Sequence, residues 1–161
     1  MPITSRVGQV QDTFAEQLRA RPGLQTLETE MQVKGPVPVD VGWPEGQLRA
    51  VHVWIDGAID DWEEEWSTTG QAGPAAKDES FTLTVNIAVT LKAKTYAPLR
   101  DVALAIASQV ELQLHEDFQI GGTAKYASVV GGALVEGVLT DGTRQVLIER
   151  RVQVRTHLTR P

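Results

Sequence analysis

Residues 81–91 read Phe-Thr-Leu-Thr-Val-Asn-Ile-Ala-Val-Thr-Leu, with a large apolar side chain at every odd position and Thr, Asn or Ala at every even one. Because side chains alternate between the two faces of a strand, this stretch predicts a strand with one fully buried face. It is longer than the usual strand of about five or six residues. We therefore expect it at the centre of a sheet, with helices covering its apolar face.

Two segments predict the covering helices. Residues 5–20 carry apolar side chains at spacings of three and four, and Pro22-Gly23 is expected to end this helix. Residues 98–115 begin with a proline, which is favoured in the first turn of a helix. Their apolar stripe is formed by Leu99, Val102, Ala103, Ile106, Val110 and Leu114.

Two segments before the central strand predict its neighbours. Residues 30–41 alternate, but Pro36 and Pro38 cannot donate hydrogen bonds to a neighbouring strand, so this is an edge or broken strand. Residues 47–55 predict a second strand, with valines on one face and Trp54 on the other. We expect Trp54 to be exposed in the single chain and to be covered by another chain.

Residues 124–159 predict a long terminal hairpin. Asp141-Gly142 is the signal for a two-residue type I′ turn, and Gly131-Gly132 predicts a bulge. Arg150 falls on the apolar face, so either its side chain extends to the surface or the strand bulges there. The predicted fold class is α+β: a single domain over residues 1–161 with a mainly antiparallel sheet.

Residues 56–78 are acidic and rich in tryptophan. They predict an excursion from the domain body, either as a hairpin arm or as a solvated acidic loop. Tryptophan is enriched at interfaces, which favours a role in contact with a partner. A Ca²⁺ site is compatible with the oxygen ligands, but the spacing of an EF-hand is absent, so we predict no metal site. The residues concerned are Asp60, Asp61, Trp62, Glu63, Glu64, Glu65 and Trp66.

Composition and motifs exclude several classes of function. The 161 residues include no cysteine and carry a formal net charge of −6, which argues against disulfides, thiolate metal sites and broad affinity for nucleic acids. We see no secretory signal and no apolar run long enough to cross a membrane. The three histidines are far apart, and no nucleotide-binding, hydrolase or metalloprotease motif is present. We therefore expect no enzyme, no cofactor and no membrane association.

The order of predicted elements, together with several short patterns, resembles the tail-terminator proteins of long-tailed bacteriophages, which are also called tail completion or minor tail proteins. The resemblance covers nearly the whole chain. It rests on Arg21-Pro22-Gly23-Leu24, on Val41-Gly42-Trp43-Pro44, on residues 79–85, on the helix with Ala103, Ile106, Val110 and Leu114, on residues 117–122 and on residues 152–156.

The resemblance implies a non-enzymatic structural protein of the virion. Such proteins form a homohexameric ring at the head-proximal end of the tail tube, end its polymerisation and present the head–tail joining surface. The implied partners are further copies of the chain, the tail tube protein and a head-side connector or neck protein. DNA would pass through the lumen without specific binding. The implied location is the tail or neck of the virion, assembled in the host cytoplasm.

Charge patterning suggests how copies of the chain meet. The terminal strand is basic through Arg150, Arg151 and Arg155, whereas residues 56–65 are acidic. We expect the acidic segment of one subunit to face this basic strand of the next, with the tryptophans supplying most of the affinity. Two other readings stay open: another ring of the phage neck, such as a head-closure or adaptor protein, and a cellular dimeric α+β domain that binds a small ligand.

Overall fold

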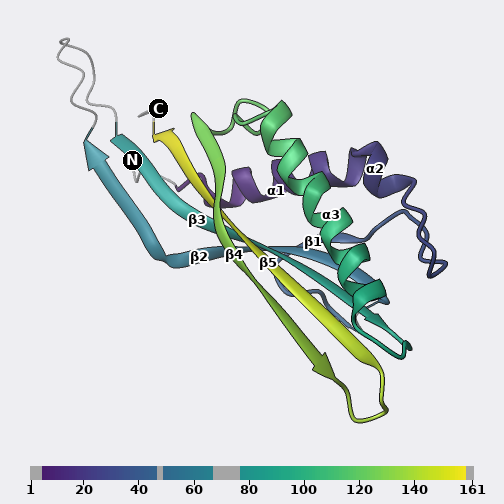
Figure 1. Ribbon diagram of the computed structural model, residues 1–161. Coiled ribbons are helices and arrows are strands. Elements are labelled where there is room, and N and C mark those ends of the chain that lie inside the picture. Colours follow the sequence, from purple (N-terminus) through teal and green to yellow (C-terminus); the bar gives the residue numbers. More distant parts are fainter. Residues whose placement is uncertain (1–4, 47–48, 67–76, 159–161) are drawn as a thin grey trace.

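The structure is a computed structural model that describes residues 5–46, 49–66 and 77–158. These residues form the helices α1 (Val7–Ala20), α2 (Pro22–Gln25) and α3 (Ala97–Glu116). They also form the strands β1 (Val39–Val41), β2 (Val51–Trp66), β3 (Lys77–Leu91), β4 (Tyr126–Val138) and β5 (Arg144–Leu158). The strands make one sheet in the order β1-β2-β3-β5-β4, which is antiparallel except for the β1–β2 pair (Figure 1). The predicted α+β fold is therefore confirmed.

Strand β3 is the centre of the sheet, as its alternation predicts. It pairs with β2 on one side and with β5 on the other; Ile87, for example, lies between Val53 and Ile148. The odd-numbered side chains from Phe81 to Val89 are buried against the helices. The strand begins at Lys77, before the apolar stretch, because its first residues pair with the ends of β2 and β5.

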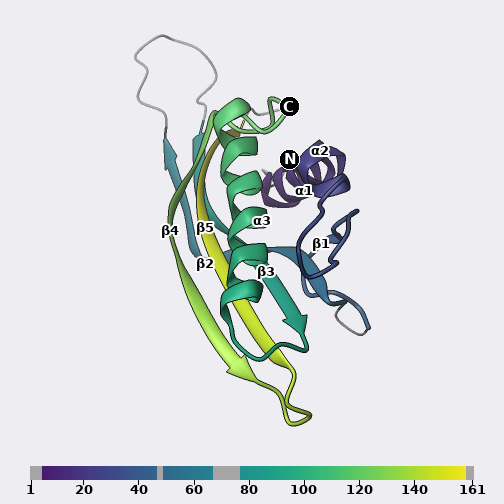
Figure 2. The same ribbon diagram turned by 45° about the vertical axis from the view of Figure 1, so that its right-hand side comes forward.

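The helices cover only one face of the sheet. Figure 2 shows all three on the same side, with α3 crossing β3, β5 and β4 and α1 lying over β1 and β2. Val10, Phe14 and Leu18 of α1 and the predicted apolar stripe of α3 are buried. Pro22 ends α1 as predicted and also begins the short helix α2. No helix of the described residues covers the opposite face, which we call the outer face of the sheet.

The acidic segment continues the sheet as far as Trp66. Glu63 pairs with Ser80 and Trp66 with Lys77, after a shift of register that begins at Ala58. Figure 1 shows a sharp bend in β2. The backbone of residues 56–66 is therefore strand, as in a hairpin arm, and not loop, because it pairs with β3. Residues 67–76 of the expected excursion lie outside the described residues.

The β4–β5 connection differs from the predicted two-residue turn. Leu139 N–H donates to the carbonyl of Thr143, and Gly142 N–H donates to the carbonyl of Leu139. The loop therefore has three residues, and Gly142 occupies its left-handed position with φ of 81°. Asp141 accepts a hydrogen bond from Thr143 N–H, which favours this wider loop.

The outgoing arm bulges and the return arm does not. The register of β4 against β5 shifts between Val129 and Gly131, so the bulge lies one residue before the predicted glycine pair. The register of β5 against β3 is continuous, and Arg150 stays on the helix side opposite the buried Val85. Its Nε donates to Glu111 on α3 over 3.0 Å, so the side chain extends to the surface.

Candidate assembly interface

The sheet has two strand edges that no described strand pairs with along their whole length, and one edge is apolar whereas the other is acidic. Strand β4 pairs with β5 on one side, and no described strand pairs with its other side. At the opposite side of the sheet, β1 covers only Val53, Trp54 and Ile55 of β2. Residues 56–58 and 63–66 of β2 pair with β3, and no other described strand pairs with this part of β2. Unpaired backbone N–H and C=O groups in such edges are templates for pairing with another chain.

Strand β4 is the apolar edge. Val130, Val135 and Val138 have exposed fractions of 54%, 56% and 56%, and Leu134 is also exposed. Edge strands are usually protected by lysines, prolines or short length, and this 13-residue strand has neither lysine nor proline. Its single charged residue, Glu136, pairs with Arg100 of α3. A long apolar edge of this kind is a site at which another chain can add a strand.

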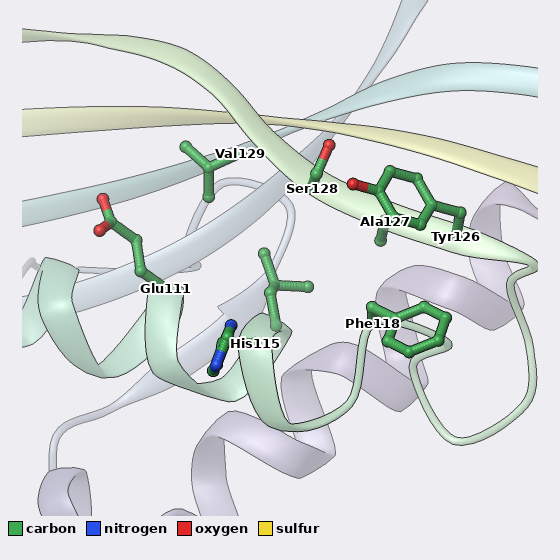
Figure 3. A pocket seen from close by; sticks show the side chains of 8 residues that line it. Glu111, His115, Phe118, Tyr126, Ala127, Ser128 and Val129 are labelled. Carbon is green, nitrogen blue, oxygen red and sulfur yellow. The ribbon is translucent and has the colours of Figure 1, made fainter.

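A groove runs between this edge and the C-terminal half of α3. It has a volume of about 580 Å³, and Figure 3 shows side chains of β4 facing those of α3 and of the following loop across it. Phe118 and Tyr126 form an aromatic pair with ring centroids 6.0 Å apart, and both rings are about half exposed. The lining residues are Glu111, Leu114, His115, Phe118, Tyr126, Ala127, Ser128 and Val129.

A cluster of cationic side chains lies next to this end of β4. The buried Asp78 of β3 lies 2.8 Å from Lys125 Nζ, 3.1 Å from Arg155 Nη2 and 2.6 Å from His157 Nδ1. Burial opposes ionisation of Asp78, but the hydrogen bond and charge of Lys125, with His157 and Arg155, outweigh it and lower the pKa of this carboxyl. We call the lysine and the arginine of this group, Lys125 and Arg155, the cationic cluster.

The three predicted interface arginines have separate surroundings. Arg150 lies on the helix side and pairs with Glu111 of its own chain. Arg151 and Arg155 lie on the outer face, opposite Thr84 and Ser80 of β3. Arg155 pairs with Asp78, and Arg151 is exposed. Strand β5 is interior to the sheet, so Arg151 and Arg155 can meet another subunit only through their side chains on the outer face, and the backbone of β5 cannot.

The expectation that Trp54 is exposed is wrong. Its side chain is 4% exposed, because Trp43 packs edge-on against it with ring centroids 5.1 Å apart. The Trp54 indole N–H donates to Asp56, which also accepts from the Asn86 amide. The chain thus covers this aromatic itself, and Trp43, which is 67% exposed, is the tryptophan presented on this part of the outer face. The sequence marked residues 42–46 only as a turn.

The acidic members of the predicted site lie on β2, the second strand edge. The structure places the backbone of Asp60, Asp61, Trp62, Glu63, Glu64, Glu65 and Trp66 there; their side chains lie outside the described part of the chain. Acidic β2 and basic β5 flank β3, so the two charged segments belong to one sheet within one chain. The groove and the apolar edge were missed because they join residues that are distant in the sequence.

Two negative findings concern the described residues only. Within residues 5–46, 49–66 and 77–158, no group of three or more His, Asp or Glu side chains is placed to hold a metal ion. In the same part of the chain, no helix combines the length and apolar character needed to cross a membrane.

Comparison with known proteins found similar chains among solved structures. Neither the family models nor the curated proteins that were searched match this chain. A chain in a solved structure described as "Virion of native gene transfer agent (GTA) particle" is similar in 94% of this chain and 99% of its own length. The two sequences are 19% identical and the TM-score is 0.41, a likeness too low to determine function.

Proposed function

We propose that this chain is a structural protein of a phage-type virion that forms a ring at the head-proximal end of the tail tube. The ring would end tube polymerisation and present the surface for head–tail joining. One observation carries the self-assembly on which this proposal depends: the sheet of the described residues has an edge on each side that no described strand pairs with, one apolar and one acidic. The specific tail role follows from the sequence resemblance to tail terminators.

Strand directions make the two edges suitable for head-to-tail contact. From β2 through β3 and β5 to β4 every neighbouring pair is antiparallel, so β2 and β4 run in opposite directions. Pairing of β4 in one copy with the free edge of β2 in the next would therefore also be antiparallel. Such heterologous contacts close into a ring when the rotation between copies is right.

Charge supports the same arrangement. The acidic edge of one copy would meet the end of the sheet that carries the cationic cluster and Arg151 of the next. Exposed ion pairs contribute only about 0–1 kcal/mol each, so we expect them to orient the subunits. The apolar side chains of β4 would provide most of the affinity.

The two ends of the sheet offer surfaces for two different partners. The β4–β5 connection lies at one end, and β2 and β3 approach their connection at the other (Figure 1). We propose that one end contacts the tail tube protein and the other the head-side connector. A ring of six copies would carry six times the net charge of −6, which favours passage of DNA through the lumen over binding to it.

Electron microscopy of the full chain mixed with its cognate tail tube protein tests the proposal. Tubes capped at one end by a ring, with length no longer increasing, are the expected result. Tubes that keep growing with no density at their ends would contradict the terminator role. Binding to isolated head connectors without binding to tubes would instead indicate a head-closure or adaptor ring.

A further inference from the structure

We propose that the groove between α3 and β4 receives the tryptophan-bearing edge of a second copy, residues 58–66 of its β2. This inference rests on the proposed head-to-tail ring and specifies the site through which neighbouring subunits recognise each other. The groove and the incoming edge would then form one composite site that neither copy contains alone.

Sheet register places the two parts at the same level. Glu63 pairs with Ser80, Ser80 with Arg155, and Arg155 with Tyr126, so these four residues form one row across the sheet. Tyr126 lines the groove. A second copy added in line with the sheet, with its β2 antiparallel to β4, would bring its acidic edge to the groove end of β4. The other end of β2 is the part that β1 already covers.

The groove has the chemistry of a strand-addition site. An edge strand that lies beside a helix offers backbone hydrogen bonds for affinity and a side-chain pocket for specificity. Leu114, Phe118, Tyr126 and Val129 supply apolar and aromatic walls. Trp62 and Trp66 are the large aromatic side chains that the acidic segment has in its sequence. Tryptophan in an apolar pocket is the typical anchor of a protein interface.

Charges around the groove are compatible with an acidic occupant. Lys125 immediately precedes β4 and Arg155 lies opposite Tyr126, and both contact the carboxylate of Asp78. Glu111 is the acidic residue in the lining, and its carboxylate is paired with Arg150 over 3.0 Å. The incoming segment carries five carboxylates between residues 60 and 65. The carboxylates of Asp78 and Glu111 are both paired within the chain, so like-charge repulsion against the incoming segment is low.

A peptide titration against the full-length, isotopically labelled chain, at a protein concentration below that at which copies assemble, tests the groove directly. The probe is a synthetic peptide of residues 56–66, and amide and side-chain NMR signals report where it binds. We expect saturable shifts at Phe118, Tyr126 and Val129. A peptide with Trp62→Ser and Trp66→Ser should bind about tenfold more weakly or not at all, because the anchors are lost.

Two variants of the chain are matched controls for each other. Phe118 lies in the groove and Leu112 lies outside it, with exposed fractions of 46% and 44%. Phe118→Ser should weaken peptide binding about tenfold or more, whereas Leu112→Ser should leave it unchanged. Spectra of both free variants verify that each remains folded.

The possible outcomes separate this inference from the proposed ring. No peptide binding, or shifts confined to another surface, would overturn the groove assignment; a ring seen by mass measurement would then leave the proposed function standing. The groove assignment would also be overturned if Phe118→Ser did not weaken peptide binding. If the peptide binds at the groove but the chain never assembles, the ring is contradicted, and the preference of the groove for residues 56–66 still stands.

Discussion

Glu79 is a fully buried carboxylate on the helix side of β3. It accepts hydrogen bonds from Ser5 Oγ, from the backbone N–H of Arg6 over 3.0 Å and from Thr156 Oγ1 over 3.2 Å. Arg6 is the N-cap residue of α1, and the helix has no side-chain cap of its own. Glu79 therefore caps α1 from the sheet, where a negative charge suits the helix dipole.

Replacing Glu79 with Gln should destabilise the fold by about 1.5–3 kcal/mol, because hydrogen bonds to a buried charged group are lost or weakened. Urea denaturation measures the change as a lower midpoint. Glu136→Gln serves as the control, since its ion pair with Arg100 lies at the surface and should contribute only about 0–1 kcal/mol. Equal midpoints for both variants would show that Glu79 does not anchor α1.

Asp117 organises the loop that follows α3. Hydrogen bonds from the backbone N–H of Gly121, from the side chain of Gln17 and from the backbone N–H of Gln119 lower the pKa of this carboxyl, against the opposing effect of burial. Gly121 has φ of 62°, a conformation that glycine adopts without strain. The loop thereby positions Phe118 beside the groove.

Asp117→Asn should lower stability at neutral pH by about 1–3 kcal/mol, because the charged acceptor is lost. The folded-state pKa of Asp117 lies below its usual value of 3.8, so the contribution of this carboxylate is present above about pH 3.8 and is lost as the pH falls through the lower folded value. Denaturation curves of both chains from neutral pH downward should therefore converge in acid. A difference that does not change with pH would contradict this role.

At the scale of elements, β4 is a long edge strand whose exposed apolar side chains a partner would bury. Val135→Lys places a charge on its exposed outer side and should abolish assembly while leaving the thermal unfolding temperature of the monomer within a few degrees. Leu112→Lys on α3 is the control and should assemble normally. Sedimentation velocity measures the assembly of both variants. Normal assembly of Val135→Lys would show that β4 is not the contact edge.

Arg151→Glu tests the charge contribution of β5. Arg151 is exposed on the outer face, so reversal should weaken assembly at low salt and have less effect at high salt, where surface charges are screened. Lys94→Glu, an exposed charge reversal in the β3–α3 connection, is the control. Identical assembly of Arg151→Glu and the unchanged chain at low salt would remove Arg151 from the interface.

The elements differ in how far their sequence predicts them. Residues 81–91 and the two long helices have a regular apolar period because each buries one face, and the structure confirms them. Residues 56–66 lack a regular apolar period, because an edge strand tolerates charged residues. Their strand conformation is seen only from their pairing with β3. The Trp43–Trp54 contact and the α3–β4 groove depend on how distant segments pack, which no local pattern contains.

At the scale of the whole molecule, the described residues form a sheet with helices on one face, no helix over the outer face and two strand edges that no described strand pairs with. This arrangement leaves a single copy with unsatisfied strand edges on opposite sides, and a closed ring would satisfy both. A two-fold dimer would use the same edge twice and leave the other unpaired. Head-to-tail contact uses both edges, and the proposed ring forms when the rotation between copies closes.

Measurement of particle mass over a wide range of protein concentration tests the ring most directly. The account predicts a closed particle near six times 17.6 kDa, whose formation Val135→Lys prevents. A tight dimer would instead support a ligand-binding domain with its site between two subunits. Such a dimer, or a chain that stays monomeric at every concentration and also in the presence of tail tubes, would contradict the account.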